Sequence, residues 1–363
     1  MRPSLPASSL LLAAAALLVG AGAPEETPRN IVDVRAVLAG APITTLHAGD
    51  MTVTIALPDA VHGFYRGTRF DWAGMIVEAR RQGHRFYGPW FDGIAPNIRD
   101  FIDDGHRLIA GPQTAATGPA EEFIDPIPGY NEAPVGGTFL KIGVGRLRKT
   151  DALRYSRFRS YAIVDNGSWR VRRTAQTVTF RQMIAPDASG YGYIYEKMVR
   201  VRSGGRLEIG HRLVNIGNRP ISTQVYNHNF TRFDDRDIGP GVSIDLPYPL
   251  PESTATPHLA SVKGSTLSYL APLAAGDHVT LSPNSVTADP GTSGFTIAGP
   301  GGMKLRAASD TPIIRAQIWS IRRVVAVEPF IAIQLPAGVE KRWVWRYNLS
   351  ANGQHRSKNH SEN

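Results

Sequence analysis

One histidine stands between two asparagines in the segment Tyr226-Asn227-His228-Asn229-Phe230, late in a run of strand-like sequence. Strand alternation places Tyr226, His228 and Phe230 on one face, so the imidazole lies between two aromatic rings. Histidine titrates near neutral pH, and a sheltered imidazole serves either in proton transfer or as a buried hydrogen-bonding group. The residues around His228 leave both roles open.

A carboxylate follows four apolar residues in the segment 324–329, where Glu328 precedes Pro329. We expect Pro329 to close this strand. Burial raises the pKa of a carboxyl group toward neutrality, which suits a general base. The structural alternative is a salt bridge from Glu328 to one of the nearby arginines, such as Arg322 or Arg323.

The elements that position these two residues are predicted to be strands of one large all-β domain. The 36 glycines and 27 prolines are scattered as turn punctuation, and no long window has apolar residues at helical spacing. Residues 24–49 are expected to be a loosely packed entry, and residues 96–134 a long surface loop. Evenly spaced strands are typical of a β-sandwich, and they are predicted at 51–57, 160–164, 169–173, 176–183, 193–202, 206–215, 221–230, 314–318, 323–328, 331–335 and 342–349.

The first 21 residues are predicted to be a secretory signal peptide. They combine a positive start, a short apolar run over residues 10–19 and small residues after it. That run is too short to span a bilayer, so we expect no membrane insertion after its removal and a periplasmic or secreted location. The domain is expected over residues 22–350, followed by a disordered tail at 351–363. The chain has no cysteine, so its stability must come from core burial.

The formal net charge of +9 favours anionic partners in general, although solubility alone also explains it. The basic, aromatic run at residues 154–159 is typical of nucleic-acid binding in a cytosolic protein. Export argues against nucleic acid and favours an anionic glycan. The sequence has no nucleophile elbow, phosphate loop, dinucleotide fingerprint, H-E-x-x-H motif or cysteine-based zinc site, so neither a cofactor nor a metal is expected.

Several short segments together resemble the aldose 1-epimerase (galactose mutarotase) superfamily. They are residues 207–217, 226–230, 327–329 with 335–338, and 136–139 through 145–147 leading to Trp169. The resemblance spans roughly residues 52–349. It implies a β-supersandwich fold with a sugar pocket on one concave sheet.

The resemblance also implies roles for His228 and Glu328. His228 would act as general acid on the ring oxygen of a sugar, and Glu328 as general base on its anomeric hydroxyl. Ring opening, rotation about the C1–C2 bond and reclosure would then interconvert anomers without a cofactor.

The superfamily usually has a further histidine before the tryptophan, and here that place is near Tyr161. A tyrosine can hydrogen-bond a sugar but does not replace an imidazole, and His84 is the candidate to approach from another strand. Arginine and aspartate bridge sugar hydroxyls, and tryptophan stacks on a pyranose. The alternatives are a salt-bridged pair for Arg69 with Asp71 and a core position for Trp90. The substrate-binding candidates are Arg69, Asp71, His84, Trp90, Lys141, Arg146, Tyr161, Tyr226 and Asn227.

The first functional hypothesis is an exported carbohydrate-active enzyme that interconverts sugar anomers, with a mono- or oligosaccharide as ligand. The second is a polysaccharide lyase acting on an anionic glycan. It is favoured by the basic charge, by Tyr195 and Lys197, and by the expected 96–134 loop. The third is a non-catalytic glycan-binding domain, which has no need of a paired His228 and Glu328. The oligomeric state stays open.

Overall fold

The strand-rich sequence folds almost entirely into β-structure. The structure is a computed structural model that describes residues 27–283, 285–286 and 293–351. Within these ranges the helical elements are α1 (Val34–Gly40) and one 3-10 turn, η2 (Pro300–Gly302). The all-β, single-domain supersandwich expected from the sequence is confirmed. The predicted signal peptide (1–21) and the tail beyond Ala351 lie outside the described residues.

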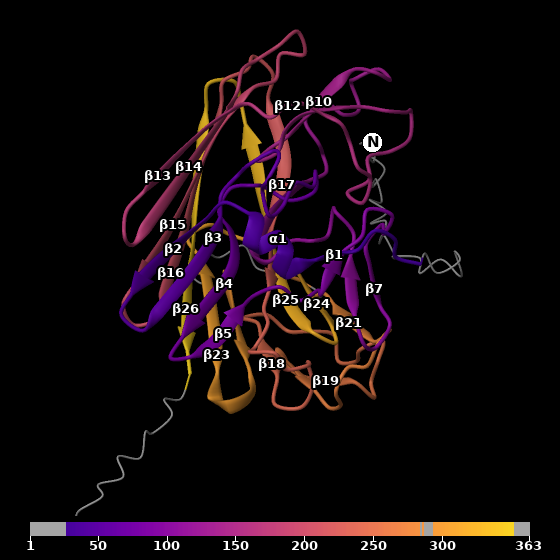
Figure 1. The fold of residues 1–363 in the computed structure, drawn as a ribbon, viewed down its shortest axis with the longest axis vertical. Coiled ribbons are helices and arrows are strands. Elements are labelled where there is room, and N and C mark those ends of the chain that lie inside the picture. The colour runs from indigo at the N-terminus through magenta and orange to yellow at the C-terminus, as the bar shows by residue number, and fades with distance from the viewer. Residues whose placement is uncertain (1–26, 284, 287–292, 352–363) are drawn as a thin grey trace, which may run out of the picture.

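Ten strands form the larger sheet, which occupies one side of the molecule (Figure 1). Alternate residues of its long strands are buried, which is the pattern of a sheet with one face in the core and one in solvent. In sheet order the strands are β13 (Ser168–Arg173), β14 (Thr177–Ile184), β15 (Tyr193–Arg202), β16 (Arg206–Asn215), β26 (Glu340–Ser350), β23 (Lys304–Ser309), β22 (Gly294–Ala298), β18 (Ser243–Asp245), β20 (Thr266–Tyr269) and β19 (Ala260–Lys263).

The second layer, here called the inner sheet, packs against the buried face of the larger sheet. An isolated bridge between Tyr87 and Thr231 joins its two parts. The first part has the order β21 (His278–Leu281), β24 (Arg315–Ile321), β25 (Val324–Leu335), β17 (Ile221–Phe230) and β9 (Gly118–Ile124). The second part is β2 (Ile43–Ala48), β3 (Met51–Ala56), β4 (Met75–Arg81) and β5 (His84–Tyr87).

The other face of the inner sheet is covered by α1, two small sheets and their loops, around a second apolar cluster. One small sheet is β1 (Val32–Asp33), β6 (Gly93–Ile94), β8 (Leu108–Ala110) and β7 (Phe101–Asp103). The other is β10 (Thr138–Lys141), β11 (Gly145–Arg148) and β12 (Ile163–Asp165). Each face of β17 therefore contacts a separate core, and its two faces carry different side chains.

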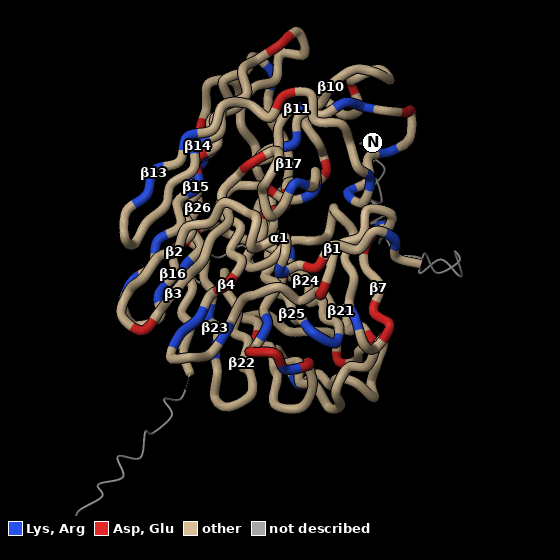
Figure 2. The backbone as a smooth tube through the Cα atoms, in the orientation of Figure 1, with Lys and Arg blue, Asp and Glu red and all other residues tan. Residues whose placement is uncertain are grey.

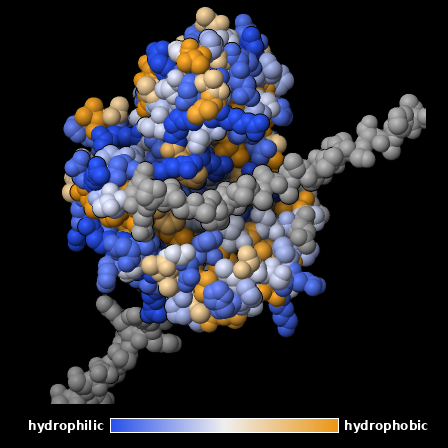
Figure 3. Space-filling model, turned by 90° about the vertical axis from the view of Figure 1, so that its right-hand side faces the viewer, coloured by the Kyte–Doolittle hydropathy of each residue, from blue (hydrophilic) through white to orange (hydrophobic). Residues whose placement is uncertain are grey.

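Charged side chains are distributed unevenly over the surface. Lysines and arginines are frequent along β13 to β16 (Figure 2). The side of the molecule that carries β1 and β7 is largely hydrophilic, with scattered hydrophobic patches (Figure 3). No helix among the described residues has the length and apolarity needed to cross a membrane.

Residues 96–134 do not form a long surface loop, so that expectation is wrong. This stretch contains β7, β8 and β9, and all seven residues of β9 are buried. β9 pairs antiparallel with β17 over its whole length. The entry at residues 24–49 is likewise more ordered than expected, because α1 and β2 lie within it.

The expectation that Pro329 closes a strand is also wrong, since β25 continues through it to Leu335. Proline has no N–H to donate, and backbone pairing with β17 is interrupted between Phe330 and Val325. The Asn229 side chain fills the gap by donating to the Val327 carbonyl at 2.8 Å. The ladder is therefore opened at the position where His228 and Glu328 lie opposite each other.

Candidate active site

His228 and Glu328 meet across the opened part of the β17–β25 ladder. His228 Nε2 lies 3.1 Å from Glu328 Oε1, and both residues are buried. Phe230 stacks on the imidazole with ring centroids 3.6 Å apart, and Trp319 meets it edge-on at 5.3 Å. The imidazole is therefore held in one orientation by aromatic packing, as strand alternation predicts.

Burial shifts the two pKa values in opposite directions. It lowers the pKa of His228 well below its ordinary 6.5, and Arg69 and Arg157 lower it further. It raises the pKa of Glu328 to about 7, against the opposing effect of the same arginines. Glu328 therefore holds a proton up to near-neutral pH, while His228 stays neutral.

A second carboxylate, Glu122 of β9, lies on the same face of the inner sheet. It accepts hydrogen bonds from Arg69 Nε at 2.8 Å and from the Tyr226 hydroxyl at 2.5 Å. Lys141 Nζ is 3.7 Å and Arg157 Nη1 is 3.4 Å from its carboxylate. Burial alone would raise the pKa of Glu122, but the surrounding cations lower it to about 2. Glu122 is thus a permanent anion that orders the basic side chains beside the His228–Glu328 pair.

A pocket of about 500 Å³ opens on this face beyond Tyr226. Three arginines line it, Arg99, Arg157 and Arg315, against one acid, Asp125. The basic, aromatic run at 154–159 supplies one wall, and the Arg315 guanidinium lies 3.5 Å from the centre of the Phe330 ring. The remaining lining residues are Ile124, Tyr155, Ser156, Phe158 and Gln224. The pocket combines positive charge with aromatic surface.

The opposite face of β9 and β17 carries a separate ionic network, buried between the two sheets. Lys197 contacts Glu121 and lies 3.3 Å from Asp71. Glu121 also accepts hydrogen bonds from His211 and from Asn227, each at 2.9 Å. Tyr195 donates to Asp71 at 2.9 Å. This network has no contact with the pocket, because Glu121 and Glu122 point to opposite sides of the strand.

Three of the substrate-binding candidates lie together beside the pair: Arg69, Lys141 and Tyr226 all contact Glu122. Asp71 and Asn227 belong instead to the network between the sheets. Arg69 and Asp71 are therefore not paired with each other, although they are two residues apart on the chain.

The other four candidates have structural partners. Trp90 is fully buried and stacks on Phe230 with ring centroids 5.6 Å apart. It therefore occupies a core position, the alternative given for Trp90 above. His84 pairs with Asp234 at 3.1 Å, and Arg146 with Asp187 at 2.8 Å. Tyr161 stacks on Tyr155 at 5.5 Å and accepts the Ser156 N–H at 3.0 Å, so it supports the pocket wall rather than facing the imidazole.

The residues that sequence reasoning missed are the two adjacent glutamates of β9 and the pocket arginines Arg99, Arg157 and Arg315. The salt bridge from Glu328 to Arg322 or Arg323 does not form, because Arg322 pairs with Asp103 and Arg323 with Asp92. The signal for the glutamates was the pair Glu121-Glu122 itself, which stands between apolar residues and needs basic partners if buried. Within the described ranges, no three histidine, aspartate or glutamate side chains are grouped as a metal site.

The low pKa of Glu122 predicts a specific loss of stability in acid. The folded-state pKa of about 2 lies below the ordinary 4.5, so the stabilising contribution is present above pH 4.5 and is lost as the pH falls toward 2. We expect Glu122→Gln to remove a pH-dependent part of the unfolding free energy of about 2 kcal/mol between pH 5 and pH 2.5. Urea unfolding at several pH values measures it, and equal slopes in wild type and variant would contradict it.

Comparison with known proteins gives structural matches only. No protein-family model matches the sequence, and no curated protein sequence matches it. A protein from Synechocystis sp. PCC 6803 is similar in structure at 12% identity and TM-score 0.49, covering 91% of this chain and 100% of that one.

Two galactose mutarotase-like proteins are also similar in structure. The protein from Lactobacillus casei ATCC 334 has 15% identity and TM-score 0.46, and covers 85% of this chain and 100% of its own. The protein from Clostridium acetobutylicum has 12% identity and TM-score 0.48, and covers 86% of this chain and 100% of its own. The descriptions of these two proteins name the superfamily that the sequence motifs of this chain resemble.

Proposed function

We propose that this protein interconverts the anomers of a sugar by acid–base catalysis at His228 and Glu328. The observation that carries the proposal is their 3.1 Å contact, in which one partner has a raised pKa and the other a lowered one. Pairs of titratable groups with opposed pKa shifts are typical of acid–base sites. A binding-only domain has no use for such a pair.

The raised pKa of Glu328 and the lowered pKa of His228 support an assignment of the acid and base roles. In ring opening, protonated Glu328 donates to the ring oxygen while neutral His228 accepts the proton of the anomeric hydroxyl. The bond from C1 to the ring oxygen then breaks as the C1 carbonyl forms, and ring closure from the other face returns both protons. These roles are the reverse of those that the sequence resemblance implies. Because His228 and Glu328 lie 3.1 Å apart, the sugar must separate them to reach both.

The pocket arginines support an acidic sugar as substrate. Arg99, Arg157 and Arg315 line the cavity and outnumber its one acid, Asp125. Guanidinium groups bind carboxylates through paired hydrogen bonds, and aromatic faces such as that of Phe158 stack on sugar rings. We therefore propose a uronic acid, in which the carboxylate would occupy the pocket.

Access to the pair requires a side chain to move. Gln224 lines the pocket, and alternation continues along the same face through Tyr226 to His228. Arg157 donates to the Tyr226 hydroxyl at 3.1 Å, so these two residues separate the pocket from the pair. The Arg157 side chain is 33% exposed and is the one that a carboxylate would draw outward.

The experiment is NMR of anomer interconversion, with neutral aldoses and their uronic acids offered side by side to the purified protein. We expect exchange faster than the buffer rate, with a preference for the uronic acids. Exchange at the buffer rate for every sugar would overturn the proposal. Binding of a sugar without faster exchange would favour the glycan-binding alternative.

The lyase alternative keeps the basic charge but loses the two other features that favoured it, Tyr195 with Lys197 and the 96–134 loop. Tyr195 and Lys197 are buried in the network between the sheets and face no pocket. Residues 96–134 are not the long surface loop that favoured a lyase, since they contain β7, β8 and β9. Unsaturated product absorbance with uronate polymers would restore this alternative.

The pH dependence of the reaction tests the assignment of roles. Glu328 is protonated below its pKa of about 7, so a rate that needs it as the acid is lost as the pH rises through 7. We expect kcat/KM to fall about tenfold per pH unit above that point, after subtraction of the buffer rate. A rate that rises through pH 7 would instead make Glu328 the base and His228 the acid.

We also propose that the protein is exported and cleaved after Ala21, on the signal-peptide pattern of residues 1–21. Expression in a bacterial host should then yield a periplasmic chain that begins at Gly22. Intact-mass analysis and N-terminal sequencing measure this. A chain that keeps Met1 and stays in the cytoplasm would contradict it.

A further inference from the structure

The solvent-facing side of the ten-stranded sheet is strongly basic. Its outward positions on the adjacent strands alternate with buried ones, and most of the charged side chains among them are cations (Figure 2). The cations are Arg170, Arg172, Arg181, Arg200, Arg202, Arg206, Arg212, Lys304, Arg306, Arg342 and Arg346, and the acids of the same face are Glu196, Glu208, Asp245 and Glu340.

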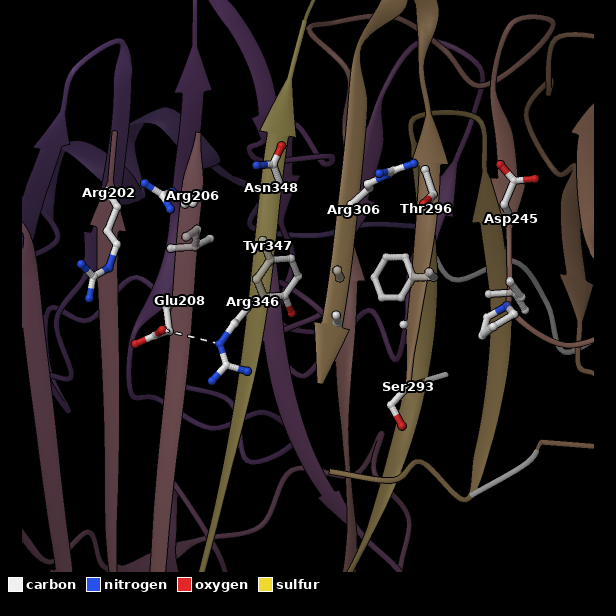
Figure 4. Close-up of a pocket in the computed structure, with 17 residues that line it drawn as sticks. Arg202, Arg206, Glu208, Asp245, Ser293, Thr296, Arg306, Arg346, Tyr347 and Asn348 are labelled. Atoms are coloured by element: carbon white, nitrogen blue, oxygen red, sulfur yellow. Dashed lines mark ion pairs between the residues drawn. The ribbon is translucent and has the colours of Figure 1, made fainter. Parts of the chain in front are cut away.

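Part of this face forms a continuous row of polar side chains across six strands. The strand registers align them, since Arg202 is opposite Arg206, Asn348 is opposite both Arg206 and Arg306, and Thr296 is opposite Arg306 and Asp245. Figure 4 shows the six side chains in this order. Neighbouring strands are about 4.8 Å apart, so the row places a hydrogen-bonding group at regular intervals perpendicular to the strands.

A groove lies along this row. Small residues, Gly294 and Ala308, stand opposite each other in the next row, where they leave a hollow. The cavity measures about 820 Å³. In the same row as Gly294 and Ala308, Glu208 and Arg346 pair at 3.8 Å on the neighbouring strands β16 and β26 (Figure 4).

The three arginines of the row have no charged partner among the described residues. Among the described residues, neither Arg202 nor Arg306 forms an ion pair, and Arg206 donates only to the Ser203 carbonyl, at 3.2 Å. Their guanidinium groups point into solvent beside the groove. Such groups are free to bind carboxylate or sulfate through two parallel hydrogen bonds.

We propose that this groove binds a strand of an anionic polysaccharide, lying across β15, β16, β26, β23 and β22. The arginines of the row pair with the acidic groups of the polymer. Asn348, between Arg206 and Arg306, and Thr296, beyond Arg306, hydrogen-bond to its hydroxyls. A membrane surface is disfavoured because, within the part of the chain that the structure describes, no exposed large hydrophobic side chain lines the groove. The groove is on the far side of the two sheets from His228, so this inference is independent of the proposed function.

The test is binding of a fluorescently labelled galacturonate hexasaccharide to the full-length protein, compared with a neutral hexasaccharide. The groove variant is Arg202→Gln/Arg206→Gln/Arg306→Gln. Its matched control is Arg170→Gln/Arg172→Gln/Arg173→Gln, which removes the same charge from the exposed edge strand β13. We expect the Kd for the galacturonate hexasaccharide to rise at least tenfold in the groove variant and less than threefold in the control.

Other outcomes overturn the proposal. Equal weakening by the two triple variants would show attraction to net charge alone, and equal affinity for the neutral hexasaccharide would remove the role of the acidic groups. Duplex DNA or vesicles with anionic lipid that compete at the same charge concentration would point to a general polyanion surface. Binding lost in a His228→Asn variant would place the polymer at the other site.

Discussion

Replacing Glu328 with glutamine is expected to lower kcat for anomer interconversion by about 10²–10⁴-fold, the usual contribution of a general acid. Glutamine keeps the shape of the side chain, but it cannot act as a proton donor in general acid catalysis. Polarimetry or NMR exchange with the preferred sugar measures the loss. The buffer rate is subtracted from the rate of each variant.

Stability separates this effect from misfolding. The pKa of Glu328 is raised above its ordinary 4.5 to about 7, so its ionisation in the folded protein costs stability as the pH rises through that range. Glu328→Gln should therefore be at least as stable as wild type at pH 8, although it is inactive. The matched control is Glu196→Gln, which replaces a partly exposed carboxylate on the ten-stranded sheet and should keep full activity.

The combined variant His228→Asn/Glu328→Gln provides a further check. Two residues that act as one unit lose no more activity together than either alone. We expect the kcat of the double variant to equal that of the less active single variant within about threefold. Fully multiplicative losses would contradict a shared proton transfer, and a Glu328→Gln variant with near wild-type kcat would end the proposal.

Replacing Lys197 with methionine is expected to lower the free energy of unfolding by about 3–5 kcal/mol, because it leaves buried carboxylates without their cation. Lys197 lies between Glu121 and Asp71, and all three side chains are almost fully buried. Burial raises the pKa of Asp71 to about 7 even with Lys197 present. Without the ammonium group, both acids must take up protons or remain as unpaired charges.

Urea unfolding at pH 7 and pH 5 measures this loss. It should be smaller at pH 5, where the acids are more readily protonated. The exposed Lys304→Met is the control and should change stability by less than about 0.5 kcal/mol. Adding Asp71→Asn and Glu121→Gln to Lys197→Met should recover part of the loss. A loss below about 1 kcal/mol in the single variant would contradict a buried ionic network.

Strand alternation was enough to predict the central elements. Residues 193–202, 206–215 and 221–230 form strands with the expected bounds, because each has a polar–apolar period of two and a turn at both ends. The same period correctly placed His228 between Tyr226 and Phe230 on one face. These features depend on neighbours along the chain, which a sequence displays directly.

The strand β9 could not be predicted in this way. Its sequence, Gly-Pro-Ala-Glu-Glu-Phe-Ile, has a proline and two charges, so it lacks both the period and the propensity of a strand. It is stable in the core because Glu121 and Glu122 find basic partners on both sides of the inner sheet. Those partners are distant in sequence, as with Lys197 for Glu121 and Arg69 for Glu122.

The sequence by itself determined the all-β class, the strands around His228 and the candidate pair of His228 with Glu328. Only the tertiary structure decided that these two side chains touch, that Arg157 and Arg315 line the pocket beside them, and that Asp71 and Asn227 lie in a different network. The physical reason is that local periodicity sets which face a side chain occupies. What it meets there depends on strand pairing between segments about a hundred residues apart, and on the burial that shifts each pKa.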